Sequence, residues 1–302
     1  MTRYGFVGLG NLGRHLAASL LRAGFPLAIH DARPEAGDEL LAAGASWAAT
    51  PREAALRSDA VFTCLPSPAL VGAVVEGDDG LFAGLARGAT WIDSSTNDRH
   101  ELARLALLAA DRGVHVLEAP VTGGVHLAAS GELTVLVGGE PHVVEAHAPA
   151  FAAIGANVFH VGPLGSASTI KVITNLLAFV HLVAAGEALM LARQAGLDLG
   201  QAFHVIKASS GTSFVHETES QVILNGSYDI GFTLDLACKD LGLALDLARE
   251  HGVPLALGDI VAERFAEARA RYGGSAWSPT VVKLLEDALG VELRAPGFPA
   301  QL

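Results

Sequence analysis

Six residues near the N-terminus have the types and the spacing that hold phosphate groups. The motif G-L-G-N-L-G follows a short β-rich run that starts at residue 4, and a helical pattern follows it. In such a turn, the unpaired N–H groups and the dipole of the helix N-terminus attract the phosphates of a dinucleotide. Gly8 permits the tight turn, Gly10 leaves room for the pyrophosphate and Gly13 allows close packing of helix on strand. A plain strand–turn–helix corner is the alternative. The predicted cofactor-binding residues here are Gly8, Leu9, Gly10, Asn11, Leu12 and Gly13.

Two charged residues bear on which dinucleotide is bound. Asp31 ends the next β-rich run, where its carboxylate could accept hydrogen bonds from the ribose hydroxyls of NAD. The same carboxylate would repel the 2′-phosphate of NADP, whereas the guanidinium of Arg33 could hold that phosphate. We favour NAD and interpret Arg33 as a solvated surface charge, with NADP as the alternative cofactor.

A second motif could hold a carboxylate. Residues 118–124 read E-A-P-V-T-G-G, a β-rich run that enters a Gly-Gly turn carrying a hydroxyl. The backbone N–H groups of Gly123 and Gly124, together with the hydroxyl of Thr122, form a concavity suited to an anion. Taken alone, the pattern fits a structural turn equally well.

The third group lies in a long apolar helical stretch. Lys171 and Asn175 are spaced i, i+4, so they share one helix face. Burying either without a partner costs about 1–3 kcal/mol, which indicates that both have a task. The bland alternative is a lysine whose amine reaches the solvent at the surface. Further on, Lys239 precedes Asp240 and follows Phe232. Lys239 could reach the cofactor or the substrate, or form an ordinary surface pair with Asp240.

The elements that must position these residues fall into two textures. Up to residue 162, β-rich runs alternate with helical stretches such as 12–24 and 98–113, which predicts an α/β fold with a mainly parallel, doubly wound sheet of the Rossmann type. One long helix, 166–195, follows, and we place it between two domains and against a second subunit. The expected divisions are 1–162 for nucleotide binding, 163–196 for the long helix and 197–302 for an all-helical domain. The predicted strands are 4–8, 27–31, 60–65, 90–93, 114–119, 134–138 and 158–161, and the later helices are 200–209, 214–224, 235–251, 255–272 and 280–289.

Composition excludes several classes of protein. The 302 residues are 51% hydrophobic and carry a formal net charge of −12, so the chain forms a core and offers no basic surface to nucleic acid or an anionic membrane. The longest uncharged apolar stretch, 172–186, is shorter than the roughly 20 residues of a membrane span. No signal peptide is expected, and two distant cysteines, Cys64 and Cys238, favour the cytoplasm. The histidine spacings fit no familiar metal site, and no metal is predicted.

These motifs, in this order, resemble the 3-hydroxyacid dehydrogenase family, which includes 3-hydroxyisobutyrate dehydrogenase and tartronate semialdehyde reductase. The resemblance runs from Phe6 to about Leu289. It covers the glycine motif with Leu12 in a methionine place, the D-x-P-V-S-G-G pattern, the G-x-x-x-K-x-x-x-N element and K-D-x-x-x-A. Two departures lie in the second pattern, where Glu118 replaces the aspartate and Thr122 replaces the serine.

The resemblance implies a role for each matching residue. Lys171 would be the catalytic acid/base. The substrate would be held by Thr122, Gly123, Gly124 and Asn175, with Phe232 beside them. Leu65, Pro66 and Thr96 would line the nicotinamide end of the cofactor, and Lys239 would close over it. The family forms homodimers or homotetramers, and the expected substrate is a small acid with a carboxylate.

The departures favour a shifted substrate over a lost activity. Thr122 adds a methyl group to the pocket, Glu118 lengthens a residue expected to support the turn, and His126 adds an ionisable ring to the substrate loop. The alternatives are an NADPH-dependent semialdehyde or glyoxylate reductase, an imine reductase, which typically lacks the lysine, and a non-catalytic NAD-binding module. The residues leave open which acid is used, the preferred direction, and dimer versus tetramer.

Overall fold

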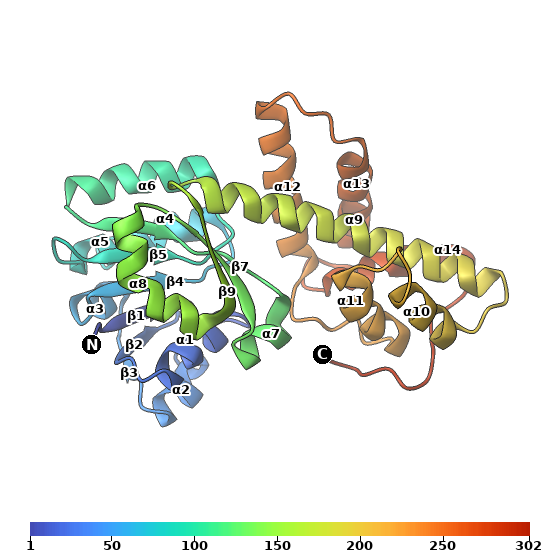
Figure 1. Ribbon diagram of the computed structural model, residues 1–302, viewed down its shortest axis with the longest axis horizontal. Helices are drawn as coiled ribbons and strands as arrows, with labels where there is room; N and C mark the ends of the chain where they lie inside the picture. Colours follow the sequence, from blue (N-terminus) through green and yellow to red (C-terminus); the bar gives the residue numbers. More distant parts are fainter. The chain divides into compact units, whose positions relative to one another are not determined.

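A computed structural model describes all 302 residues, which form two compact units, Met1–Lys171 (unit 1) and Val172–Leu302 (unit 2) (Figure 1). Every named strand lies in unit 1, whereas unit 2 is helical. The strands therefore stop where the sequence predicts, after residue 162. Each unit has a buried apolar core of its own.

Unit 1 is built on one nine-stranded sheet. Its order is β3-β2-β1-β4-β5-β6-β8-β7, with β9 paired to β8. The strands from β3 to β6 run parallel, and β8 is antiparallel to β6 and β7. The predicted mainly parallel, Rossmann-type sheet is confirmed. The strands are β1 (Tyr4–Val7), β2 (Leu27–His30), β3 (Ser46–Trp47), β4 (Ala60–Thr63), β5 (Thr90–Asp93), β6 (His115–Glu118), β7 (Val121–Thr122), β8 (Leu133–Gly138) and β9 (Gly155–Gly162).

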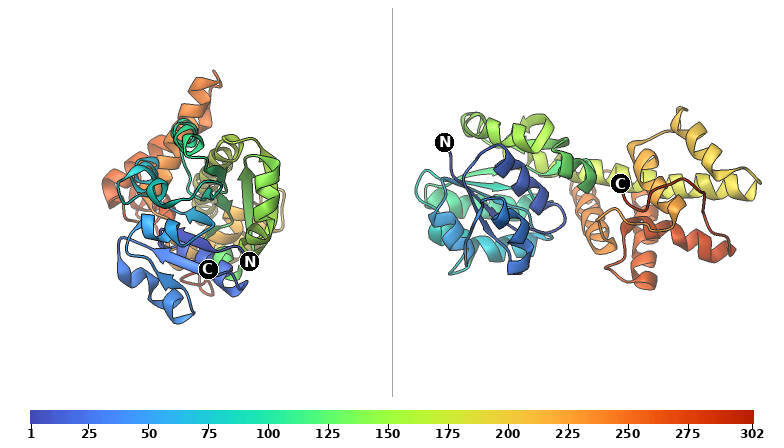
Figure 2. Two further views of the ribbon diagram at one scale, coloured as in Figure 1. Left: turned by 90° about the vertical axis from the view of Figure 1, so that its left-hand side faces the viewer. Right: turned by 90° about the horizontal axis from the view of Figure 1, so that it is seen from below.

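Helices cover both faces of this sheet (Figure 2). Successive side chains of a strand point to opposite faces, so Phe6 joins one core and Val7 the other. The central strands β1, β4 and β5 are consequently buried at every residue, as expected of a parallel sheet covered on both sides. The helices of unit 1 are α1 (Gly13–Arg22), η1 (Pro34–Gly37), α2 (Asp38–Ala42), α3 (Pro51–Leu56), α4 (Pro68–Glu76), α5 (Leu81–Gly84), α6 (Arg99–Asp111), α7 (Gly124–Ser130) and α8 (Pro141–Ile154).

Helix α9 (Ser166–Gln194) begins in unit 1 and continues into unit 2. The sequence predicts it as 166–195. By length and composition alone, α9 could cross a membrane. The sequence analysis does not predict this, because it considers only the apolar stretch 172–186. A core helix of a soluble protein passes the same test. Only 28% of its apolar window is buried. The remaining helices are α10 (Leu199–Lys207), α11 (Phe214–Asn225), α12 (Leu234–Glu250), α13 (Ala256–Tyr272), η2 (Ser278–Val282) and α14 (Lys283–Leu289).

Two sequence predictions in these regions need correction. The last strand starts at Gly155 and not at 158, and its first residues follow α8 without a break. The helix predicted over 280–289 is two elements, because a 3-10 turn with Pro279 in its first positions precedes α14.

Candidate active site

The glycine motif forms a turn whose backbone is open to a ligand at one position. A Cβ at Gly8 would lie 2.4 Å from the carbonyl oxygen of Cys64, and one at Gly13 would lie 2.0 Å from the carbonyl oxygen of Gly8. Gly8 also has φ +98°, where a side chain is strained. In contrast, a Cβ at Gly10 would meet nothing within 4 Å. The turn thus has tight packing where the motif needs it and free space where a pyrophosphate would approach, so its residues fit a dinucleotide.

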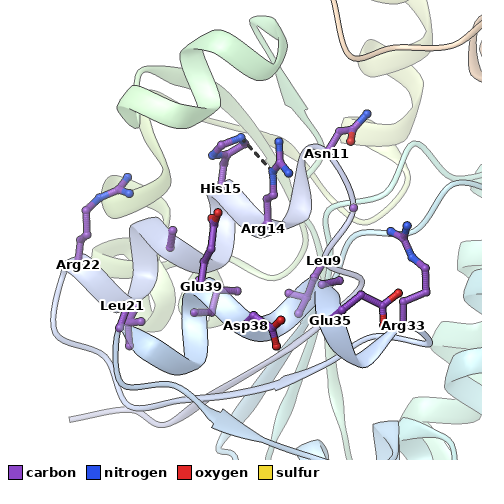
Figure 3. Close-up of a pocket in the computed structure, with 15 residues that line it drawn as sticks. Leu9, Asn11, Arg14, His15, Leu21, Arg22, Arg33, Glu35, Asp38 and Glu39 are labelled. Atoms are coloured by element: carbon purple, nitrogen blue, oxygen red, sulfur yellow. Dashed lines mark hydrogen bonds between the residues drawn. The ribbon is translucent and has the colours of Figure 1, made fainter.

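Asp31 is tied to this turn through both of its carboxylate oxygens. The backbone N–H of Leu9 donates to Oδ2 at 2.7 Å, and that of Arg33 donates to Oδ1 at 2.9 Å. The Arg33 guanidinium is 68% exposed and stays 3.8 Å from Asp31. A cleft of about 720 Å³ begins at this point and extends along α1 toward α2 (Figure 3). Asn11 and Arg33 stand at its near end, beside the glycine turn.

A buried carboxylate organises the loops after β4 and β5. Asp93 accepts hydrogen bonds from the Thr63 hydroxyl at 2.8 Å, the Ser95 N–H at 3.1 Å and the Asn97 amide at 2.7 Å. Ser95 then accepts from the N–H of Leu65 at 2.9 Å. Burial raises the pKa of Asp93, and these donors oppose that shift. The segments that carry the predicted residues Leu65, Pro66 and Thr96 are therefore joined, through a residue that the sequence analysis missed.

The predicted carboxylate turn follows β7. Thr122 ends that strand and is half-buried, and Gly123 and Gly124 have φ values of +127° and +84°. Only glycine adopts such angles readily, which gives the Gly-Gly pair its structural reason. The ring of His126 lies against this turn, since a Cβ at Gly124 would be 3.2 Å from it. Burial lowers the pKa of His126.

Lys171 is buried on α9, with 8% of its surface exposed. The alternative in which the Lys171 amine reaches the solvent at the surface is therefore wrong. Glu118 is fully buried at the end of β6 and accepts hydrogen bonds from the N–H groups of Ala167, at 2.7 Å, and Ser168, at 2.9 Å. Its carboxylate caps the start of α9, a contact that the sequence analysis does not predict, and the expected support of the Gly-Gly turn stays a prediction.

In unit 2, a second buried carboxylate brings two predicted residues together. Asp240, 1% exposed on α12, accepts a hydrogen bond from the Asn175 amide at 2.6 Å. Its Oδ1 lies 2.7 Å from the Lys239 ammonium, an ionic contact without the angles of a hydrogen bond. An ordinary surface Lys–Asp pair is thus excluded. Phe232 stacks on Phe179, at 6.2 Å between ring centroids, on the core of unit 2.

Comparisons with known proteins agree over nearly the whole chain. Residues 3–162 match the family profile of the NAD-binding domain of 6-phosphogluconate dehydrogenase. Residues 165–285 match that of the NAD-binding domain of NADP-dependent 3-hydroxyisobutyrate dehydrogenase. Together the two profiles account for the sheet unit, α9 and most of the helices that follow.

Three similar proteins illustrate the match. The 2-(hydroxymethyl)glutarate dehydrogenase of Eubacterium barkeri is 32% identical, over 96% of this chain and 97% of that protein. The NAD-dependent L-serine dehydrogenase of Pseudomonas aeruginosa is 35% identical, over 86% and 90%. The crystal structure of a 3-hydroxyisobutyrate dehydrogenase from Salmonella typhimurium has a TM-score of 0.88 and 34% identity, covering 94% of this chain and 100% of that one. An imine reductase of Myxococcus stipitatus, 18% identical with a TM-score of 0.63, shares the fold alone.

Proposed function

The chain belongs to the 3-hydroxyacid dehydrogenase family, and we propose that it interconverts a small 3-hydroxy acid and its semialdehyde or oxo acid with NAD(P). The observation that carries this proposal is the buried Lys171, one helical turn before Asn175 on α9. A module that only bound NAD would need the glycine turn but would have no use for this lysine. The catalytic lysine and the low identity to imine reductases also weigh against imine reduction.

Lys171 is the proposed proton carrier. The bound nicotinamide supplies or accepts the hydride. In oxidation, the neutral amine of Lys171 takes the proton of the substrate hydroxyl, and in reduction its ammonium form returns a proton to the carbonyl oxygen. A free lysine has a pKa of about 10.4, so oxidation is expected to have an alkaline optimum.

The remaining residues hold the two ligands. Thr122, Gly123 and Gly124 bind the substrate carboxylate through a hydroxyl and backbone N–H groups, and Asn175 and Phe232 complete the substrate contacts. The cofactor is held by Gly8, Leu9, Gly10, Asn11, Leu12, Gly13, Asp31, Leu65, Pro66, Thr96 and Lys239. We propose NAD as the preferred cofactor, because the carboxylate of Asp31 stands where it disfavours a 2′-phosphate.

We also propose a division of labour along the chain and an oligomer. Residues 1–162 bind the nucleotide, 163–196 form the connecting helix, and 197–302 bind substrate and take part in dimerisation. On α9, the apolar side chains of Ile173, Leu177 and Leu191 are exposed, which supports a homodimer or homotetramer that covers them. The chain is assigned to the cytoplasm, with α9 as a core helix of a dehydrogenase fold.

The direct test follows absorbance at 340 nm with NAD and NADP separately. The panel is 3-hydroxyisobutyrate, serine, glycerate, threonate, 3-hydroxypropionate, phenylserine and 2-(hydroxymethyl)glutarate, the last being the substrate in a relative's name. Turnover with one of them, faster with NAD, is expected. Failure with all of these, and with semialdehydes plus NAD(P)H, would refute the proposal.

Lys171→Ala separates the enzyme from a binding module. It is expected to lower kcat by about 10²–10⁴-fold, the usual contribution of a general acid/base, while NAD binding measured by calorimetry persists. Lys207→Ala is the matched control, since Lys207 is 48% exposed and pairs with Glu217 at the surface. Unchanged turnover in Lys171→Ala would contradict its role as the proton carrier.

A further inference from the structure

We propose that Glu118 is a positioning residue that fixes Lys171 relative to the turn of Thr122, Gly123 and Gly124. The inference rests on the proposed function, which makes Lys171 the proton carrier and this turn the holder of the substrate carboxylate. All of these residues belong to unit 1, so their arrangement is set within one compact unit.

The carboxylate of Glu118 divides its two oxygens between consecutive residues of α9. The N–H of Ala167 donates to Oε1, and the N–H and hydroxyl of Ser168 both donate to Oε2. N–H groups in the first turn of a helix have no acceptor within the helix, so this carboxylate supplies what they lack. Lys171 lies one helical turn after Ala167 and Ser168 on α9, so the bonds from Glu118 to these two residues fix the start of the helix that carries the lysine.

The strand side of this link is equally fixed. Glu118 pairs with Asp93 in the parallel ladder of β5 and with Gly138 in the antiparallel ladder of β8. Thr122 follows four residues later and pairs with Thr134 of the same strand β8. A single side chain therefore connects the sheet that carries the turn to the helix that carries the lysine.

The length of the Glu118 side chain is matched to its surroundings. A Cβ at Gly138 would lie 2.3 Å from Oε1 of Glu118 and 2.8 Å from its Cγ. Glycine at 138 thus leaves the space that the longer acid occupies, and the two positions depend on each other.

Helix stability alone does not explain this arrangement. Half-buried serine, threonine and aspartate side chains cap other helices here, as Ser67, Thr50 and Asp98 do for α4, α3 and α6. A buried carboxylate is a costly cap, since desolvation penalises its charge, and burial indeed raises the pKa of Glu118. A rigid, geometrically defined link between strand and helix is what the buried acid adds.

The test is a two-residue cycle of Glu118→Asp, Gly138→Ala and the double variant. Glu118→Asp withdraws the carboxylate from α9 by one methylene, and Gly138→Ala pushes against it. Each single change is expected to lower kcat about 10-fold or more, because misplacing a catalytic group by ~1 Å can cost up to 10²-fold. KM should change less than about 3-fold, since the carboxylate turn stays on its strand. The double variant should match Glu118→Asp instead of adding the loss of Gly138→Ala, because the shorter acid removes the clash with a Cβ at position 138 while its carboxylate still stops short of α9, as expected of coupled sites.

A second readout needs no turnover. The chain has four lysines, Lys171, Lys207, Lys239 and Lys283, so NMR of protein carrying ¹³C at lysine Cε gives few signals. The Lys171 signal, identified by its loss in Lys171→Arg, should move in Glu118→Asp and stay moved in the double variant, while those of Lys207 and Lys283 stay in place. If the parent protein turns over no substrate and the Lys171 signal still moves in Glu118→Asp, the proposed function is refuted and the positioning role is kept.

Two results would overturn the inference. One is unchanged kcat and an unchanged Lys171 signal in both Glu118→Asp and Glu118→Gln. The other is that these variants lower the melting temperature and alter kcat and KM together while the Lys171 signal does not move. That result would show that Glu118 only caps the helix. Ser213→Ala is the matched control, because it removes the side-chain cap of α11, a helix that carries no proposed site residue, and should leave kcat and the Lys171 signal unchanged.

Discussion

Each unit of the molecule buries a carboxylate next to residues with proposed catalytic roles, but the two units hold that carboxylate differently. Glu118 in unit 1 is held by two backbone N–H groups and one hydroxyl. Asp240 in unit 2 contacts two side chains, the Asn175 amide and the Lys239 ammonium. Backbone donors survive most substitutions, whereas side-chain donors do not. The site residues of unit 1 should therefore tolerate exchange of neighbouring side chains better than those of unit 2.

The glycines point the same way. Unit 1 forms its turns with Gly8, Gly123 and Gly124, all at positive φ, so the ligand-facing groups are backbone atoms. Asn175, Lys239 and Asp240 instead stand on the regular helices α9 and α12, where only the side chains can contact a ligand. Apart from Lys171, backbone shape defines the ligand contacts proposed for the turns of unit 1, and the chemical identity of a few side chains defines those of unit 2.

Among the variants that compare the two units, the largest effect is expected from Asp240→Ala. Asp240→Ala removes a buried carboxylate that contacts both the Asn175 amide and the Lys239 ammonium, and breaking a buried ionic contact costs about 3–5 kcal/mol of folding free energy. The variant should lose about 10²–10³-fold in kcat/KM, measured with the substrate that the panel identifies. Asp246→Ala on the same helix is the control, because Asp246 forms an exposed pair with Arg249. Equal losses in the two variants would break the comparison between the units.

The next effect is an opposite pH response of the two units. In unit 1, His147 is buried between the Tyr4 hydroxyl, at 2.9 Å, and the Thr90 hydroxyl, at 3.0 Å. Burial lowers its pKa from 6.5 to about 4. The unfolded chain therefore binds a proton that the folded one does not, and the free energy of unfolding falls by about 3 kcal/mol as pH drops from 6.5 to 4.

In unit 2, Glu219 has the reverse sign. Its Oε2 is buried without a hydrogen-bond partner, and burial raises its pKa from 4.5 to about 8. The folded chain binds the Glu219 proton more tightly than the unfolded chain. The contribution of Glu219 to the free energy of unfolding is therefore complete below pH 4.5 and is lost as pH rises through 8. Urea unfolding between pH 4 and 9 measures both. His147→Gln should flatten the acid limb and Glu219→Gln the alkaline limb. If neither variant changes the profile, the assignment of both groups fails.

How much of the fold could be predicted depends on how local its signals are. The long helix α9 was predicted within one residue, because apolar composition and the closing Gly196 are local features. Helices α3 and α4 were missed, although Thr50 before Pro51 and Ser67 before Pro68 are typical helix starts. Helix α3 has only six residues and α4 is apolar along most of its length, so neither shows a clear helical period.

The candidate site divides in the same manner. The glycine turn could be predicted because its backbone geometry demands particular residue types at fixed spacing. The contacts of Asp93 with Thr63 and of Asp240 with Asn175 could not, because these partners lie 30 and 65 residues apart in sequence. Glu118 was noticed as a departure but assigned to the nearby turn, since only the fold brings residues 167 and 168 to its carboxylate.

The smallest effect concerns the choice of cofactor. It tests whether cofactor binding in unit 1 depends on the charged side chain of Arg33 beside the glycine turn. Arg33 donates to Asp31 through its backbone N–H, which a substitution keeps, while its guanidinium is exposed. Arg33→Ala should leave kcat/KM for NAD within about 2-fold and lower that for NADP about 5-fold, because an exposed charge is worth roughly 1 kcal/mol.

The matched control is Arg22→Ala, at the opposite end of the same cleft (Figure 3). It removes the same charge and should leave the ratio of the two cofactors unchanged. A loss of NAD activity above 10-fold in Arg33→Ala would show that a side chain, and not the backbone, holds the nucleotide at this edge. The contrast between the backbone-formed ligand turns of unit 1 and the side-chain contacts of unit 2 would then fail at the cofactor-binding edge.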